Sequence, residues 1–312
     1  MKRSVYYLQL MRPVQWVKNV FVVIPLIFSK NLFNVSLFSR SALTFVAFCL
    51  AASAIYIVND IADRKRDLLH PVKNKRPIAS GMVKVAEGWM AAFLLLVLSF
   101  LVMKLGNCGM SSAAAIAAYV LINIFYSFLL KEVVLVDVFV IALGFILRIL
   151  AGGYAIDVKI SSWLIMTTLF VSLFLGIAKR RGEFVSMGGG SQIGEDSGRT
   201  SRRVLFDYDL SLIDQILSVS AASVIITYAL YTMSARTVRV FGTEALIFTT
   251  VFVVYGIFRY LFLIHKLGLG ENPTGALLTD KPMLINIILY TISVVLIIYK
   301  RELALLISRY VS

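Results

Sequence analysis

Long apolar runs, each close to 20 residues, are the feature that most restricts what this chain can fold into. The runs recur between residues 19 and 299 and are separated by polar segments. A helix of about 20 apolar residues is long enough to cross the hydrocarbon core of a bilayer. We therefore predict an all-α, polytopic membrane protein rather than a soluble globular chain.

Nine spans are predicted, and together they would form a single integral membrane domain over residues 1–312. Two long charged segments, 59–84 and 179–209, separate some of them. The predicted bundle has its spans at residues 19–38, 41–58, 85–105, 110–130, 134–156, 160–178, 210–232, 244–264 and 283–299.

The net charge of +14 would suggest a nucleic-acid partner in a soluble protein. Here Lys and Arg concentrate in alternate connections between spans, by about two to one, as the positive-inside rule describes. This pattern predicts a plasma-membrane protein with a cytoplasmic N-terminus and cytoplasmic segments 59–84 and 179–209. It makes nucleic acid an unexpected partner and favours anionic lipids or an anionic substrate.

Several kinds of site are excluded by the residue counts. The chain has two cysteines, Cys49 and Cys108, and two histidines. Two lone thiols provide neither a disulfide framework nor zinc-ligand spacing. No nucleophile elbow accompanies the histidines, so Ser/His/Asp and Cys/His catalysis find no support.

Acidic residues gather where the second predicted span ends. Asn59, Asp63 and Asp67 are four residues apart, and Asp60 lies three before Asp63, so a helix would present all four on one patch. Three close carboxylates repel one another unless a cation lies among them. Oxygen ligands suit Mg²⁺, which completes its shell with water and substrate phosphates. The patch therefore predicts a magnesium and diphosphate site; the alternative is a solvated helix end whose acids pair with the basic residues 64–66.

Basic residues follow this patch closely. Lys73, Lys75 and Arg76 would suit a substrate with several phosphate groups, although they could also serve only as a topology signal. His70 has no partner at metal-ligand spacing, so we expect a structural role or a phosphate contact for it.

Further polar residues lie within or beside the fourth and fifth spans. Tyr126 could be an interfacial residue and Lys131 a snorkelling charge, or both could contact substrate. Asp137 and Arg148 are eleven residues apart, which is close to three helical turns. They could pair with each other or bind substrate, because ionisable residues inside spans often function.

The second charged segment begins with Lys179, Arg180 and Glu183. Its glycine-rich part, 188–198, lacks the ending of a phosphate-binding P-loop and is predicted to be a linker or a lid. Asp207 and Asp209 give only a weak indication of a second metal cluster.

These motifs together resemble the UbiA-type intramembrane prenyltransferase superfamily. The resemblance rests on Asn59-Asp60-x-x-Asp63-x-x-x-Asp67, on the number of spans and on the N-terminal segment 12–19. Within the superfamily the chain looks most like the decaprenyl-phosphate phosphoribosyltransferase branch. The stretches that support the branch are Gln15-Trp16-x-Lys18-Asn19, Tyr56-x-x-Asn59-Asp60, Arg76-Pro77-Ile78-Ala79-Ser80-Gly81, Tyr126-Ser127 with Lys131 and Asp137, Arg148-x-x-Ala151-Gly152-Gly153 and Lys179-Arg180-x-x-Glu183.

The resemblance implies a nine-helix bundle around a central, lipid-accessible cavity. Most members bind a prenyl diphosphate through two aspartate motifs, whereas Lys179, Arg180 and Glu183 stand where the second acidic motif is expected here. The branch implies Mg²⁺-dependent transfer of phosphoribose from 5-phosphoribosyl 1-diphosphate to a polyprenyl phosphate. The implied catalytic and metal-binding residues are Asp60, Asp63 and Asp67, and the implied substrate-binding residues are Lys18, Asn19, Asn59, Lys73, Arg76, Tyr126, Lys131, Asp137, Arg148, Lys179 and Arg180.

Two alternative functions are kept. One is transfer of a prenyl group from a prenyl diphosphate to an aromatic or other acceptor. The other is a transporter or channel with a divalent-cation site, which the position of the acids at a span's end disfavours.

Overall fold

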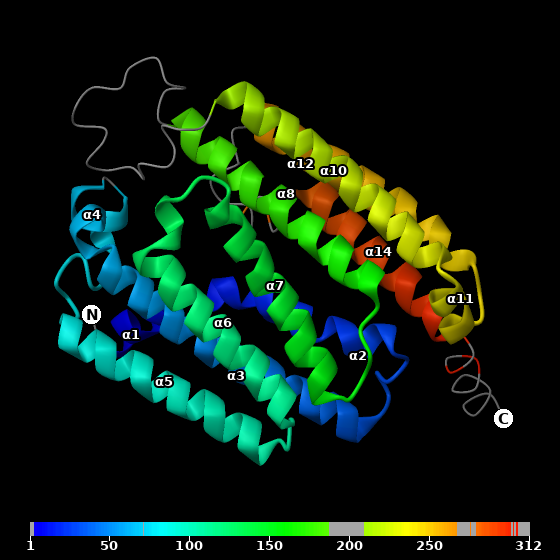
Figure 1. The fold of residues 1–312 in the computed structure, drawn as a ribbon, viewed down its shortest axis with the longest axis horizontal. Coiled ribbons are helices and arrows are strands. Elements are labelled where there is room, and N and C mark those ends of the chain that lie inside the picture. The colour runs from blue at the N-terminus through cyan, green and yellow to red at the C-terminus, as the bar shows by residue number, and fades with distance from the viewer. Residues whose placement is uncertain are drawn as a thin grey trace. The chain divides into compact units, whose positions relative to one another are not determined.

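The computed structural model is α-helical throughout the part of the chain that it describes (Figure 1). The described residues are 3–70, 72–186, 209–266, 275, 279–300, 302 and 304. Nine helical segments among them are long and apolar enough to cross a membrane. The predicted polytopic all-α class is therefore confirmed.

The described elements form two compact units. The first contains α1 (Arg3–Met11), the 3₁₀ helix η1 (Pro13–Val22), α3 (Val35–Ala62), α4 (Arg64–Leu69), η2 (Lys73–Lys75), α5 (Val85–Leu105), α6 (Met110–Phe128), η3 (Leu130–Glu132) and α7 (Val136–Ala155). The second contains α8 (Ser162–Ser186), α10 (Leu210–Met233), α11 (Ala235–Phe241), η5 (Ala245–Thr249), α12 (Thr250–Lys266) and α14 (Lys281–Ile298). The short α2 (Ile24–Phe28) lies at the boundary between the two sets of residues.

Helix α3 is the central helix of the first unit. It packs along α5 and α6, and η1 and α7 also contact it (Figure 1). Its middle is rich in small residues, among them Ala47, Ala51 and Ala54, all fully buried. Small side chains let membrane helices approach closely, so they allow α3 to be enclosed on several sides.

The first predicted span, 19–38, is wrong. The first segment long enough to span runs from Arg3 to Phe28, and α3 already begins at Val35. Asn34 caps α3, because its side chain accepts a hydrogen bond from the backbone N–H of Leu37 at 3.2 Å. An Asn before an apolar run is a helix-start signal, and it marks a break inside the predicted span.

The second unit is organised around two helix pairs. Helix α8 lies beside α10, and α12 lies beside α14 (Figure 1). An apolar cavity of about 220 Å³ lies among these four helices, and Phe174, Val224, Ile257 and Tyr290 are among its lining residues.

An ion pair fixes the start of α14. Two side-chain nitrogens of Arg259, Nε and Nη2, donate to the carboxylate of Asp280, at 3.0 and 2.8 Å. Asp280 also caps α14 by accepting from the N–H of Met283 at 2.9 Å. The hydrogen bond from Arg259 lowers the pKa of the Asp280 carboxyl below its ordinary value of 3.8.

We expect Asp280→Asn to lower the melting temperature at pH 7 and to lose this effect in acid. A carboxyl with a lowered pKa in the folded state stabilises the fold above its unfolded pKa, and this contribution disappears as the pH falls below about 4. Asparagine still caps a helix, so the change isolates the ion pair. Thermal unfolding in detergent at pH 7 and pH 3 would measure it, with Glu244→Gln as the control. An equal deficit at both pH values would contradict the prediction.

Candidate active site

The acidic patch lies where α3 ends and α4 begins. Asn59 and Asp60 occupy the last turn of α3, Asp63 follows it, and Asp67 lies on α4. The helix is interrupted at Asp63. The N–H of Asp63 nevertheless bonds to the carbonyl of Asn59, and the N–H of Asp67 to that of Asp63, both at 2.9 Å. Helical spacing is thus kept across the interruption, and the predicted patch forms.

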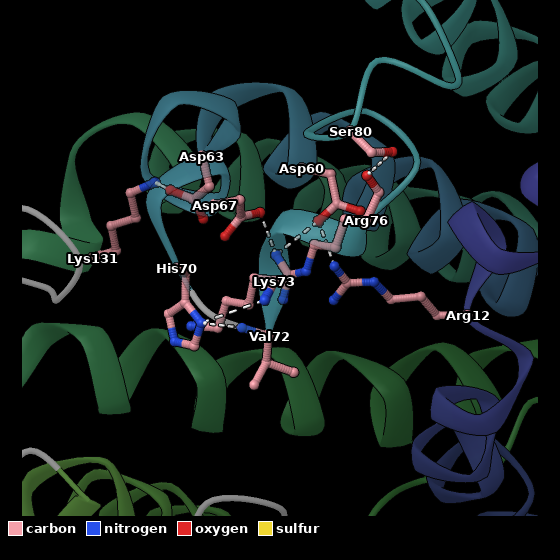
Figure 2. Close-up of polar contacts among 10 residues, drawn as sticks. All are labelled: Arg12, Asp60, Asp63, Asp67, His70, Val72, Lys73, Arg76, Ser80 and Lys131. Atoms are coloured by element: carbon pink, nitrogen blue, oxygen red, sulfur yellow. Dashed lines mark hydrogen bonds and ion pairs between the residues drawn. The ribbon is translucent and has the colours of Figure 1, made fainter.

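Two arginines share one oxygen of Asp60 (Figure 2). Nη1 of Arg76 donates to Asp60 Oδ1 at 3.0 Å, and Nη2 of Arg12 donates to the same atom. The Asp60 side chain is only 2% exposed, so the two guanidinium groups supply the neutralisation that water cannot. Arg12 was not predicted as a site residue. Its place in the N-terminal segment 12–19, which carries the family resemblance, was the available signal.

Arg76 connects Asp60 to Asp67. The same Nη1 atom lies 2.7 Å from Oδ2 of Asp67. The backbone around Arg76 is held by Ser80, whose N–H and hydroxyl both donate to the Arg76 carbonyl at 2.8 Å. The Arg76 guanidinium therefore binds two of the three carboxylates, those of Asp60 and Asp67.

Lys131 pairs with the remaining carboxylate. Its Nζ lies 2.5 Å from Oδ1 of Asp63, and its side chain is 7% exposed. Arg66 binds the neighbouring Glu132 at 2.7 Å, which fastens η3 to α4. Lys131 is therefore not a snorkelling residue. The alternative in which residues 64–66 pair with the aspartates is not what the described residues show, because the aspartates pair with Arg12, Arg76 and Lys131.

Arg148 and Asn19 form a separate buried network. The Nε of Arg148 donates to Asn19 Oδ1 at 2.8 Å, and Nη2 donates to the Tyr119 hydroxyl at 3.2 Å. The guanidinium also lies 5.0 Å from the ring centre of Phe48. Arg148 does not pair with Asp137, because eleven residues of helix separate the two by about 16 Å along the axis.

The other predicted site residues are only partly brought together. His70 Nδ1 accepts from the N–H groups of Val72 and Lys73 at 3.2 and 3.3 Å, which gives His70 a structural role in the turn. Lys18, Lys73 and Tyr126 are half-buried in the first unit, and Asp137 is buried there. Lys179 and Arg180 belong to the second unit, where both pair with Glu183. Asp207 and the 188–198 segment lie outside the described residues.

The sequence profile of the UbiA prenyltransferase family matches residues 22–268. The chain belongs to this family. It is a membrane-embedded transferase, and the resemblance predicted from its motifs is confirmed.

Curated UbiA relatives carry a more specific name. A decaprenyl-phosphate phosphoribosyltransferase of Corynebacterium glutamicum is 34% identical over 71% of this chain and 65% of its own length. A protein of the same name from Mycolicibacterium smegmatis is 32% identical over 72% of this chain and 69% of its own. The chain thus spans about two thirds of the length of these relatives.

Solved UbiA structures share the fold. A homolog from Archaeoglobus fulgidus bound to GPP and Mg²⁺ superposes with a TM-score of 0.69 at 18% identity, covering 93% of this chain and 99% of its own. At this identity the similarity supports the fold alone.

The donor chemistry of the UbiA patch in this chain fits Mg²⁺. Within the described part of the chain, each of Asp60, Asp63 and Asp67 has one oxygen bound by a cationic side chain and one that accepts no hydrogen bond. The Oδ1 of Asn59 is buried and also lacks a partner among the described residues. The described residues nevertheless include no group of three or more acidic, histidine or cysteine side chains arranged around one point. Free carboxylate and amide oxygens are the ligands that Mg²⁺ takes in proteins.

Proposed function

We propose that this protein transfers 5-phosphoribose from 5-phosphoribosyl 1-diphosphate to a polyprenyl phosphate and releases diphosphate. The observation that carries the proposal is the alternation of three carboxylates with Arg12, Arg76 and Lys131 in one patch. Metal-binding carboxylates suit a diphosphate, and the added cations suit a further phosphate group and a phosphate-bearing acceptor. The names of the two phosphoribosyltransferase relatives support the same reaction.

The proposed bond changes need no general base. A phosphate oxygen of the polyprenyl phosphate, already anionic at pH 7, attacks C1 of the ribose. The bond between C1 and the diphosphate oxygen breaks, and its electron pair leaves with the diphosphate. The products are polyprenyl-phosphoryl-5-phosphoribose and diphosphate, so atoms and charge balance.

The chain's residues would bind and orient the two substrates. Asp60, Asp63 and Asp67 would hold Mg²⁺ with Asn59, and bound Mg²⁺ would stabilise the charge that develops on the leaving diphosphate. Arg76 would bind phosphate oxygens from its place between two of the aspartates.

The remaining predicted residues fall into three groups in this scheme. Lys18 and Lys131 are candidates for the phosphate of the lipid. Lys73 is a candidate for the phosphates of the donor, and Lys179 and Arg180, which belong to the second unit, stay predicted phosphate-binding residues. Asn19, Tyr126, Asp137 and Arg148 would shape the site around the substrates.

A transfer assay tests the proposal. We expect purified protein with Mg²⁺, polyprenyl phosphate and donor labelled in the ribose to move label into the organic phase, and chelation by EDTA to stop it. A cytoplasmic site in the plasma membrane would give this activity to inside-out vesicles and not to sealed right-side-out vesicles.

A second candidate reaction is prenyl transfer from a prenyl diphosphate, which the family name favours. Folded protein that transfers no ribose to polyprenyl phosphates of several lengths, but consumes a prenyl diphosphate, would replace our proposal with this one.

A further inference from the structure

Arg12 is held over the acidic patch by an unusual backbone. It separates α1 from η1 with φ 50° and ψ 60°, in the left-handed region. Residues other than glycine rarely adopt this backbone conformation, and a proline favours an extended backbone at the residue before it. The fold therefore keeps an arginine where glycine would be less strained. The turn places its guanidinium 5.6 Å from the ring centre of Tyr56 and against Asp60.

The two arginines on Asp60 differ in what else they hold. Arg76 binds Asp67 as well as Asp60, so losing Asp60 would leave it with a partner. In the described part of the chain Arg12 has Asp60 as its only hydrogen-bond acceptor through a side chain. Its side chain is 26% exposed, so an incoming anion can reach it. Arg12 is therefore the cation that can leave the Asp60 carboxylate and bind a phosphate of the substrate.

Binding of a divalent metal ion to this patch without a phosphate group would be electrostatically unfavourable. Each of Asp60, Asp63 and Asp67 is already neutralised by an arginine or a lysine. A divalent cation bound to the free oxygens of these carboxylates would be repelled by the cationic groups at short distance. A phosphate group removes the conflict, because it draws a guanidinium away from its carboxylate into a charge-assisted hydrogen bond.

We propose that Arg12 is a phosphate-binding residue that exchanges Asp60 for a phosphate of the substrate, so that Mg²⁺ and the diphosphate bind together and Mg²⁺ alone binds weakly. The proposal rests on the function proposed above and adds a residue and a binding order to it. It also explains why a buried carboxylate destined for a metal is paired with two guanidinium groups.

Binding of Mn²⁺, a paramagnetic substitute for Mg²⁺, tests the exchange without measuring turnover. Free Mn²⁺ would be followed by electron paramagnetic resonance, alone and with inorganic diphosphate or 5-phosphoribosyl 1-diphosphate. We expect either phosphate compound to tighten Mn²⁺ binding to the wild-type protein by about 10- to 100-fold, within the range usual for coupled sites.

Arg12→Gly removes the guanidinium and suits the left-handed backbone, so we expect this variant to fold. Mn²⁺ alone should bind it about tenfold more tightly than it binds the wild type, and the coupling to diphosphate should largely disappear. Arg12→Lys should restore part of the coupling. Arg3→Gly is the matched control, because Arg3 is an exposed arginine that pairs with Glu87, and both binding constants should stay unchanged.

Three results would each contradict one part of the argument, namely the role of Arg12, the exchange or the proposed function. Unchanged coupling in folded Arg12→Gly would overturn the role of Arg12. Wild-type protein that binds Mn²⁺ equally well with and without diphosphate would overturn the exchange. Failure of the wild type to bind either phosphate compound, with or without Mn²⁺, would instead overturn the proposed function. If Arg12→Gly does not fold, Arg12→Gln supplies the same comparison.

Discussion

Asp60→Asn should reduce phosphoribosyl transfer by at least about a thousandfold. Asp60 is the most buried acid of the patch and the one that two arginines share. Asparagine keeps the shape and one oxygen but removes the negative charge that would hold a metal ion. Metal-ion stabilisation of a leaving group contributes several kcal/mol to the transition state, which corresponds to a factor of about a thousand or more in rate.

The measurement is single-turnover transfer together with Mn²⁺ binding in the presence of diphosphate. Asp60→Asn should lose both the transfer and the Mn²⁺ binding, while thermal unfolding and detergent gel filtration should show that the variant is folded. Glu87→Gln is the control, because it also removes one acidic charge from the first unit, loosens the contact with Arg3 and keeps a side-chain oxygen that can accept from the N–H of Lys84. Near-normal turnover in Asp60→Asn would remove Asp60 from the site.

Gly152→Ala should destabilise the first unit by about 3 kcal/mol or more. A Cβ at residue 152 would lie 1.9 Å from the carbonyl oxygen of Val22, so α7 and η1 would have to separate. Forcing atoms into a close-packed contact typically costs 1–3 kcal/mol and more when backbone must move. This cost exceeds the gain of about 1 kcal/mol that alanine brings over glycine inside a helix.

Gly144→Ala is the matched control on the same helix. Its added Cβ would meet Nη1 of Arg148 and the ring of Tyr119 at 3.4 Å, which is an ordinary contact. We expect its melting temperature to stay within a few degrees of the wild type, and that of Gly152→Ala to fall by about 5–10 °C. The shift of η1 should also weaken the Arg12 contact, so diphosphate coupling should fall in Gly152→Ala. Equal melting temperatures would show that η1 and α7 do not pack as described.

The amino-acid sequence is sufficient to predict those features that depend on neighbours along the chain. The apolar runs predict membrane helices, because helix formation in a bilayer requires only length and hydrophobicity. The four-residue spacing of Asn59, Asp63 and Asp67 predicts one patch, because the helical repeat places such residues on one face. The same local signals carried the family resemblance that the profile match confirmed.

The interruption after residue 28 falls inside the predicted span 19–38, where Lys30, Asn31 and Asn34 break the apolar run. A span assigned from the length of an apolar run merges the end of one apolar segment with the start of the next. Local capping chemistry decides where α3 begins, and it acts through a single side chain that the length of an apolar run does not resolve.

Only the tertiary structure decides which cation neutralises which carboxylate. Arg12 is 48 residues from Asp60, and Lys131 is 68 residues from Asp63. Residues 64–66 lie beside the acids in sequence, yet Arg12 and Lys131 come from distant segments, and of the three cations only Arg76 lies near the acids along the chain. Arg148 likewise meets Asn19 and Tyr119 rather than Asp137. Helical periodicity specifies a face, whereas partners across helices depend on how closely the backbones approach, which small residues such as Gly152 determine.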